Sequence, residues 1–170
     1  SLRGDPLRMT NRSPFRFLVS VLLLVMTVPA GAQAWQWARD LGGTDADIGK
    51  DVCLDPQNNV HVAGWTIGEV TGDCAPLAGT GASSIFLAKY DPFGSCLWSR
   101  VEGSPGDDVA RGIATDAQGN TFITGSYSAL AQFGGNTLGV QGDADVFVAK
   151  YGPDGDFLWV AHGGGPFDEQ

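Results

Sequence analysis

The chain has 170 residues, with 10 basic and 19 acidic side chains and a formal net charge of −9 at pH 7. Such an acidic surface repels phosphate backbones, so the composition argues against a nucleic-acid partner, which requires basic patches. It also argues against docking on an anionic membrane. The 25 glycines and 9 prolines favour many short strands over helices.

The first 34 residues predict a secretory signal that takes no part in the fold. Arg12 and Arg16 precede an apolar run at 17–28, and Ala32 and Ala34 form a small-x-small end. This pattern describes a cleavable signal, cut after Ala34, with a few upstream residues before it. The run is short for a membrane span, which needs about 20 residues, so an uncleaved anchor is the weaker alternative. We expect export to the medium or the cell surface, with no membrane contact after cleavage.

A repeat of 61 residues organises the remainder. Trp37, Trp98 and Trp159 are spaced by 98 − 37 = 61 and 159 − 98 = 61. A gap-free overlay of 37–97 on 98–158 gives 17 identities in 61 positions by direct count. A fixed period of this kind is typical of repeat architectures. Within 35–170 we predict a lone fourth strand at 35–41, one unit at 42–102, a second at 103–163 and the start of a third at 164–170.

Each unit reads as four short strands that are rich in β-branched or aromatic residues and bounded by turns. Asp55 and Asp116 can each accept a hydrogen bond from their own turn, with Asn58 or Gly119 in the left-handed position. The predicted strands are 51–55, 60–66, 84–90 and 96–100 in the first unit, and 112–116, 121–127, 145–151 and 157–161 in the second.

Two faces of each unit are apolar, which predicts packing on two neighbours. Phe86, Ala88 and Tyr90 point one way, whereas Ile85 and Leu87 point the other. Four-stranded units packed face to face around a channel form a β-propeller, usually of four to eight blades. The fold class is therefore all-β, with about two propeller blades of four antiparallel strands.

The longest connections in the two units, at 66–82 and 127–143, are rich in glycine. They are also the segments in which the two copies differ most, and only a leucine and a glycine persist at equivalent positions. Loops that vary on a constant scaffold are where binding specificity is expected.

A family resemblance rests on two segments of the second unit. GNTFITG at 119–125, followed by DVFVAKYGPDGDFLW at 145–159, resembles the SBBP repeat, the seven-bladed β-propeller repeat of secreted bacterial proteins. The first copy departs from the pattern, with NNVHVAG at 58–64 and Ser84 in place of an aspartate. The resemblance implies an exported or surface-attached propeller, and the family carries no agreed catalytic residues.

A closed ring needs about four blades, so two units and a start imply a fragment of a longer protein. The alternative is self-association of half-rings, which would cover exposed sheet edges. The segment 35–40 matches a fourth strand and would complete the last blade of a full ring. Without that blade, we expect this segment to be disordered or mispaired.

We assign no catalytic, cofactor-binding or metal-binding residue. His61 has Phe122 as its repeat partner, which favours a packed histidine, and His162 is expected as a strand-end or loop residue. Four aspartate pairs offer carboxylates to a cation, but none has the calcium loop of about twelve residues with a closing glutamate. We expect them to cap turns and solubilise loop tips; they are Asp45/Asp47, Asp107/Asp108, Asp143/Asp145 and Asp154/Asp156.

Aromatic residues at the end of the second strands, Trp65 and Tyr127, could stack on sugar rings, but core packing is favoured because large apolar side chains are usually buried. The repeated tryptophans are expected to be structural. The repeated cations are expected to form salt bridges or cover aromatic faces; they are Lys89/Lys150 and Arg39/Arg100.

In an exported protein one cysteine pair could be a disulfide. Cys74 with Cys96 is the pairing that we consider, and Cys53 is read as a small buried apolar residue.

The preferred function is therefore that of an exported, non-enzymatic β-propeller repeat protein for extracellular or cell-surface binding, adhesion or scaffolding. Its expected partners are an unidentified extracellular protein or carbohydrate and the remaining blades of a longer chain. One alternative is the N-terminal part of a propeller enzyme, polysaccharide-directed or quinone-dependent, with its active site in other blades. A purely structural spacer is the other alternative.

Overall fold

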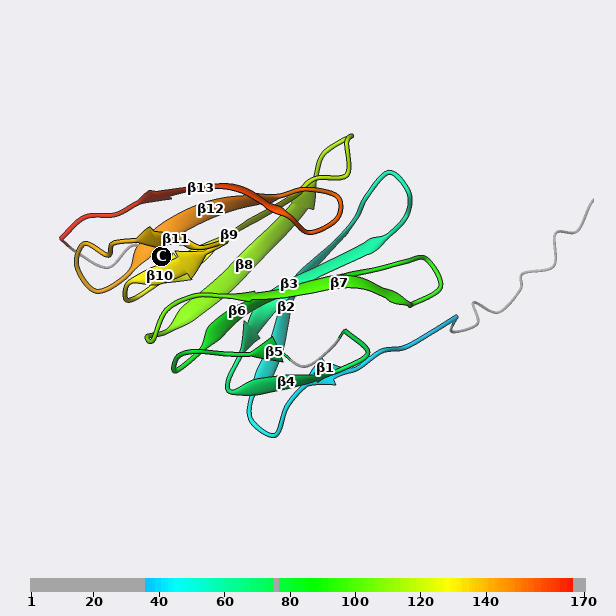
Figure 1. Ribbon diagram of the computed structural model, residues 1–170, viewed down its shortest axis with the longest axis horizontal. Helices are drawn as coiled ribbons and strands as arrows, with labels where there is room; N and C mark the ends of the chain where they lie inside the picture. The colour runs from blue at the N-terminus through cyan, green and yellow to red at the C-terminus, as the bar shows by residue number, and fades with distance from the viewer. Residues whose placement is uncertain (1–35, 75–76, 167–170) are drawn as a thin grey trace, which may run out of the picture. The chain divides into compact units, whose positions relative to one another are not determined.

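The computed structural model describes residues 36–74 and 77–166, so the predicted signal and the last four residues of the third copy lie outside it. Within the described residues, all regular structure is β (Figure 1). Two four-stranded antiparallel sheets follow the orders β2-β3-β6-β7 and β8-β9-β12-β13, and we call them blade 1 and blade 2. The all-β fold of propeller blades is thereby confirmed, and the two described sheets do not close into a ring.

The strand bounds are regular between blades. Blade 1 contains β2 (Asp47–Leu54), β3 (Val60–Thr66), β6 (Ser84–Tyr90) and β7 (Cys96–Glu102). Blade 2 contains β8 (Asp108–Thr115), β9 (Thr121–Tyr127), β12 (Asp145–Tyr151) and β13 (Phe157–Gly163). Shorter strands lie before blade 1 and in the connection between the second and third strands of each blade: β1 (Leu41–Gly42), β4 (Glu69–Gly72), β5 (Leu77–Ala78), β10 (Ala131–Phe133) and β11 (Asn136–Leu138).

The two inner strands of each blade have the predicted bounds, but the first and fourth strands are longer than predicted. The register of β2 on β3 shifts between Gly49 and Asp51, and that of β8 on β9 shifts between Ala110 and Gly112. A β-bulge of this kind adds one residue and breaks the two-residue alternation. The strands therefore continue on the far side of each bulge, where the sequence pattern could not be followed.

The hairpins between the first two strands form as expected. The Asp55 carboxylate accepts hydrogen bonds from the backbone N–H groups of Gln57 and Asn59, both at 2.9 Å. Asn58 has a φ of 62° and Gly119, at the same place in blade 2, has a φ of 80°. These residue types are the ones that adopt left-handed backbone readily, which confirms the turn prediction.

The blades pack with β8 against β2 and β3. Equivalent faces of the two sheets therefore differ in burial, since one face of blade 1 is covered by blade 2. Leu87 is fully buried between the blades, whereas its counterpart Val148 is 40% exposed. On the opposite face, Phe147 and Tyr151 are buried in the core that joins the blades. The prediction that each sheet has two apolar faces is therefore confirmed, and blade 2 presents one of them uncovered within the described residues.

A tryptophan and an arginine on the fourth strand of blade 1 fasten it to blade 2. Trp98 Nε1 donates to the Pro153 carbonyl at 2.9 Å, and Arg100 Nε donates to the Gly155 carbonyl at 2.9 Å. A side chain at Gly155, whose φ is 82°, would place its Cβ 2.8 Å from the Trp98 ring. Both the backbone conformation and this close approach therefore require glycine.

The segment before blade 1 makes the same contacts one repeat earlier. Trp37 Nε1 donates to the Pro92 carbonyl at 3.0 Å, and Arg39 Nε donates to the Gly94 carbonyl at 2.6 Å. Residues 36–40 nevertheless form no strand. Leu41–Gly42 pairs with β4, whereas the fourth strand of a blade pairs with the third strand of the same blade. The segment thus docks on blade 1 as β7 docks on blade 2, but without a sheet of its own.

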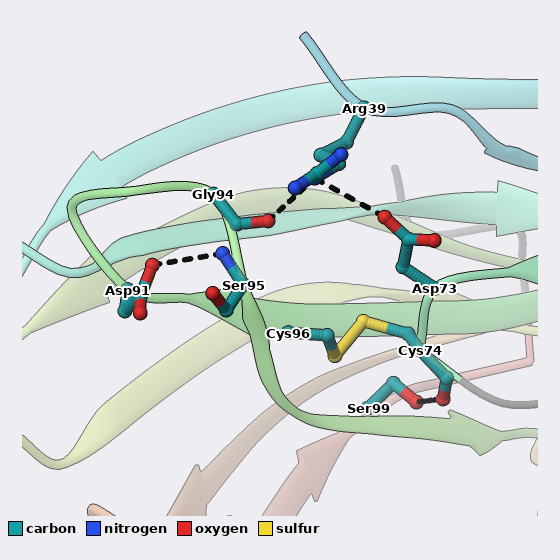
Figure 2. Close-up of a disulfide and its surroundings, with 8 residues drawn as sticks. All are labelled: Arg39, Asp73, Cys74, Asp91, Gly94, Ser95, Cys96 and Ser99. Carbon is teal, nitrogen blue, oxygen red and sulfur yellow. Dashed lines mark hydrogen bonds and ion pairs between the residues drawn. A yellow bond between two sulfur atoms is a disulfide. The ribbon is translucent and has the colours of Figure 1, made fainter. Parts of the chain in front are cut away.

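One disulfide joins the long connection of blade 1 to its fourth strand (Figure 2). Cys74 and Cys96 are bonded with their Cα atoms 5.3 Å apart, which is the pairing considered from the sequence. Ser99 Oγ donates to the Cys74 carbonyl at 2.7 Å, and Arg39 lies 3.1 Å from the Asp73 carboxylate. Cys53 is a free thiol, half-buried against the core, and burial raises its pKa.

Candidate functional site

The most concentrated group of ionisable side chains lies inside the contact between the blades. Asp55, His61 and Lys89 come from blade 1 and Thr121 from blade 2. Asp55 Oδ2 lies 3.0 Å from Lys89 Nζ and 3.3 Å from His61 Nε2. Thr121 Oγ1 lies 2.9 Å from His61 Nδ1. A hydroxyl, an imidazole and a carboxylate in this order also form a catalytic triad.

Burial excludes such chemistry at this position. His61 and Thr121 are both 0% exposed, so the hydroxyl cannot meet a substrate. Desolvation lowers the pKa of His61, which keeps the ring neutral at pH 7. The neutral ring then donates from Nε2 to Asp55 and accepts from Thr121 at Nδ1. His61 is the packed histidine that its repeat position predicted, and it ties the two blades together.

The second blade repeats the ion pair in a more open setting. Lys150 lies 3.2 Å from the Asp116 carboxylate and 4.6 Å above the centre of the Phe122 ring. Hydrogen bonds from Asn120, together with Lys150, lower the pKa of Asp116 to about 2. The prediction that the repeated lysines form salt bridges or cover aromatic faces is confirmed in both blades, and the repeated arginines pair with Asp73 and Asp156.

The other histidine lies near the end of β13 and is exposed. His162 Nδ1 is 2.8 Å from the hydroxyl of Tyr127, which also donates to the Gly139 carbonyl at 2.7 Å. Burial and the nearby Asp145 raise the pKa of Tyr127 to about 12, so the phenol stays protonated. This is a strand-end histidine, as predicted, that supports the connection before β12.

The aspartate pairs do not share one role, which corrects part of the prediction. Asp47 accepts from the Gly43 backbone at 2.6 Å and so caps a turn as expected. Asp108 and Asp145, however, are fully buried at the starts of β8 and β12, where they accept hydrogen bonds from Ser104 and from the Gln141 backbone. They fix the loops that precede their strands and do not solubilise loop tips. Within 36–74 and 77–166, no three His, Cys, Asp or Glu side chains gather in a way that could hold a metal ion.

The two aromatic residues at the ends of the second strands also differ. Tyr127 is fully buried, as predicted for core packing. Trp65 is only half-buried and lines a pocket of about 350 Å³ between the blades. Lys50, Asp107 and Arg111 line the same pocket. We call this the basic pocket. Sequence reasoning did not identify it, although both copies carry a cation at the repeat position of Lys50 and Arg111.

The long connections, which run between β3 and β6 and between β9 and β12, have different structures. The blade 1 connection, 67–83, pairs with β1 through β4 and is fastened by Cys74 to β7. The blade 2 connection, 128–144, instead forms a small hairpin of β10 and β11. The divergence seen in the sequence is therefore a divergence in shape on two otherwise matching sheets.

Comparison with known proteins agrees with the fold. Residues 36–69 match the profile of the SBBP family, described as a beta-propeller repeat. A curated relative is an uncharacterized WD repeat-containing protein of Acanthamoeba polyphaga mimivirus, 28% identical over 156 residues. The alignment covers 74% of this chain and 11% of that relative, so the chain spans about a tenth of the relative's length. No helix of the described residues is long and apolar enough to cross a membrane.

Proposed function

We propose, from the SBBP beta-propeller repeat that this chain contains, that it serves as a non-enzymatic scaffold that binds a partner outside the cell. The observation that carries the proposal is the contrast between constant blades and variable connections. The clamp of tryptophan and arginine and the aspartate–lysine pair recur with a 61-residue period. The connections 67–83 and 128–144 have equal length but different folds. A scaffold that varies only there is suited to recognition.

Two further features support an extracellular setting. The Cys74–Cys96 disulfide is of a kind that persists in oxidising compartments and is rare in the reducing cytosol. The residues after the predicted signal carry 6 basic and 18 acidic side chains, so their formal charge is 6 − 18 = −12. Such a charge favours solubility and disfavours nucleic acid. The name of the WD repeat relative, which refers to its repeat and not to an enzymatic activity, supports the non-enzymatic part of the proposal.

A connection swap tests the binding role. Residues 67–83 of the full-length protein are replaced by the sequence of 128–144, and Cys96 by phenylalanine, the residue at its repeat position. The intact and swapped proteins are then incubated with culture supernatant and with cell-wall polysaccharide from the producing cell. We expect the intact protein to retain a partner that the swapped protein does not. Equal retention by two folded proteins contradicts recognition through this connection.

Export is tested separately by expressing the full open reading frame in a bacterial host and sequencing the N-terminus of the released protein. We expect it to begin at Trp35. A variant with Ala34→Arg is the control, because a large charged residue at the small-x-small end prevents cleavage. Recovery of the wild-type protein only in the cytosol, with residues 1–34 still attached, contradicts the proposal.

A further inference from the structure

Two cations of the described residues stand apart from the others. Six lysines and arginines lie in 36–74 and 77–166, and four of them form ion pairs: Arg39, Lys89, Arg100 and Lys150. Lys50 and Arg111 form no ion pair with a described residue, and both are exposed. Acidic side chains far outnumber basic ones in these residues, so two cations that lie close together without an ion pair indicate a role other than pairing on the surface.

Lys50 and Arg111 also share an unusual backbone position. They are equivalent in the repeat, since 50 + 61 = 111, and each is the extra residue of the bulge in the first strand of its blade. A bulge leaves its extra residue out of the ladder and re-aims its side chain, and bulges are common beside binding sites. Because β2 packs against β8, the two side chains line one pocket.

We propose that the basic pocket binds a carboxylate-bearing sugar, such as a uronate residue of an extracellular polysaccharide. Lys50 and Arg111 supply two positive charges, and the arginine offers the paired donors that fit a carboxylate. Trp65 supplies a half-buried aromatic wall of the kind on which a sugar ring stacks. The inference rests on the binding role proposed above and names a ligand class for it.

Asp107 separates this ligand from an acidic peptide. Its carboxylate lines the same pocket, and its backbone N–H donates to Ser128 Oγ at 2.7 Å, which fixes the loop before β8. A carboxylate accepts hydrogen bonds but donates none, so it suits the hydroxyl groups of a sugar. A run of glutamates offers no hydroxyl donors and is repelled by Asp107. The net charge of the pocket, 2 − 1 = +1, is thus matched to one carboxylate on a hydroxyl-rich ring.

The test is calorimetric titration of the full-length protein with a galacturonate hexamer and with the same hexamer as its methyl ester. We expect the wild-type protein to bind the acid with an affinity that falls as salt is added. Its affinity for the neutral ester should be lower by about tenfold or more. The variant K50Q/R111Q should lose about tenfold or more in affinity for the acid. W65F should weaken the binding of both hexamers, because the phenyl ring offers a smaller stacking face.

The matched control is Q57E/Q118E, which changes the net charge by the same −2 at the exposed tips of the first hairpins. We expect it to retain the wild-type affinity within about twofold, since charges farther away than a Debye length are screened. Because the side chains of Lys50 and Arg111 are exposed, K50Q/R111Q should unfold at the wild-type temperature, so a loss of binding is not a loss of folding.

Several results overturn the inference: no binding of the acid by the wild-type protein, equal losses in K50Q/R111Q and in the control, or equal binding of acid and ester. Binding of a glutamate hexamer as tightly as the galacturonate hexamer also overturns it, in favour of an acidic peptide. A protein that loses its partner in the connection swap but binds no galacturonate keeps the proposed role and refutes only the pocket. If the protein binds galacturonate through the pocket and the swapped protein retains the partner as well as the intact one, the pocket is kept and recognition through the connection is refuted.

Discussion

The two aspartate–lysine pairs of the repeat form a natural experiment on burial. Asp55 and Asp116 each accept the same three turn hydrogen bonds, so the pairs differ in what covers them and in the contact of Asp55 with His61, where blade 2 has Phe122. The Lys89 and Asp55 side chains are 6% and 0% exposed because blade 2 lies over them, and Lys89 also donates to the Pro153 carbonyl at 3.0 Å. The Lys150 and Asp116 side chains are 20% and 24% exposed.

Replacing each lysine with methionine keeps the length of the side chain and removes its charge. Lys89→Met should lower the free energy of unfolding by about 3 kcal/mol, because it leaves a buried carboxylate without its counter-charge. Lys150→Met should lower it by about 1 kcal/mol or less, since water reaches that pair and replaces much of the interaction. Urea denaturation of the full-length protein followed by tryptophan fluorescence measures both values by linear extrapolation.

A second substitution identifies the origin of the loss. Adding Asp55→Asn to Lys89→Met removes the uncompensated charge, so the double variant should recover part of the stability that Lys89→Met loses. Equal losses of stability in the two lysine variants would refute the assignment of this energy to a buried charge. So would simple additivity, in which the double variant is less stable than Lys89→Met by the full cost of Asp55→Asn alone.

Three further predictions address the disulfide, the buried histidine and the clamp. Reduction of Cys74–Cys96, which closes a loop of sequence separation 22, should lower the free energy of unfolding by up to about 3 kcal/mol, seen as a lower melting temperature in reductant. Because burial lowers the pKa of His61, the unfolded chain binds a proton more readily near pH 6, so stability should fall from pH 7.5 to pH 5.5, and His61→Phe should flatten that slope in urea denaturation. Gly155→Ala should cost about 2 kcal/mol through its left-handed backbone and the Trp98 contact, whereas Gly152→Ala, whose Cβ would meet only the Asp156 carbonyl oxygen at an ordinary 3.7 Å, should change the melting temperature little.

Alternation and turn chemistry were sufficient to predict most of each blade. The strands at 60–66 and 84–90 and their copies in blade 2 have the bounds expected from the sequence, because apolar residues on both faces and bounding turns identify such strands. The bulges were missed because one extra residue shifts the alternation without leaving a signature in composition. This omission also hid the basic pocket, since Lys50 and Arg111 then seemed to lie outside any strand.

The burial of Asp108 and Asp145 was the other feature that the sequence did not predict. Each aspartate stands at the boundary between a glycine-rich segment and a strand, where an exposed carboxylate is the usual expectation. In the structure the side chain turns inward, and donors from the preceding loop reach the carboxylate, although the buried Oδ1 atom of Asp145 has no hydrogen-bond partner among the described residues. Which loop donors reach a buried acid depends on the tertiary path of the chain, and a single sequence does not specify that path.

The contacts that hold the blades together and the pocket between them have a common origin in the repeat. Trp98 and Arg100 of blade 1 act on carbonyls of blade 2, so neither blade completes this clamp alone. The basic pocket is divided in the same way, with Lys50 and Trp65 from blade 1 and Arg111 from the first strand of blade 2. A repeat protein of this kind gains stability from nearest-neighbour contacts. A site shared by two blades therefore depends on the same contacts, and ligand binding there would stabilise the junction by mass action.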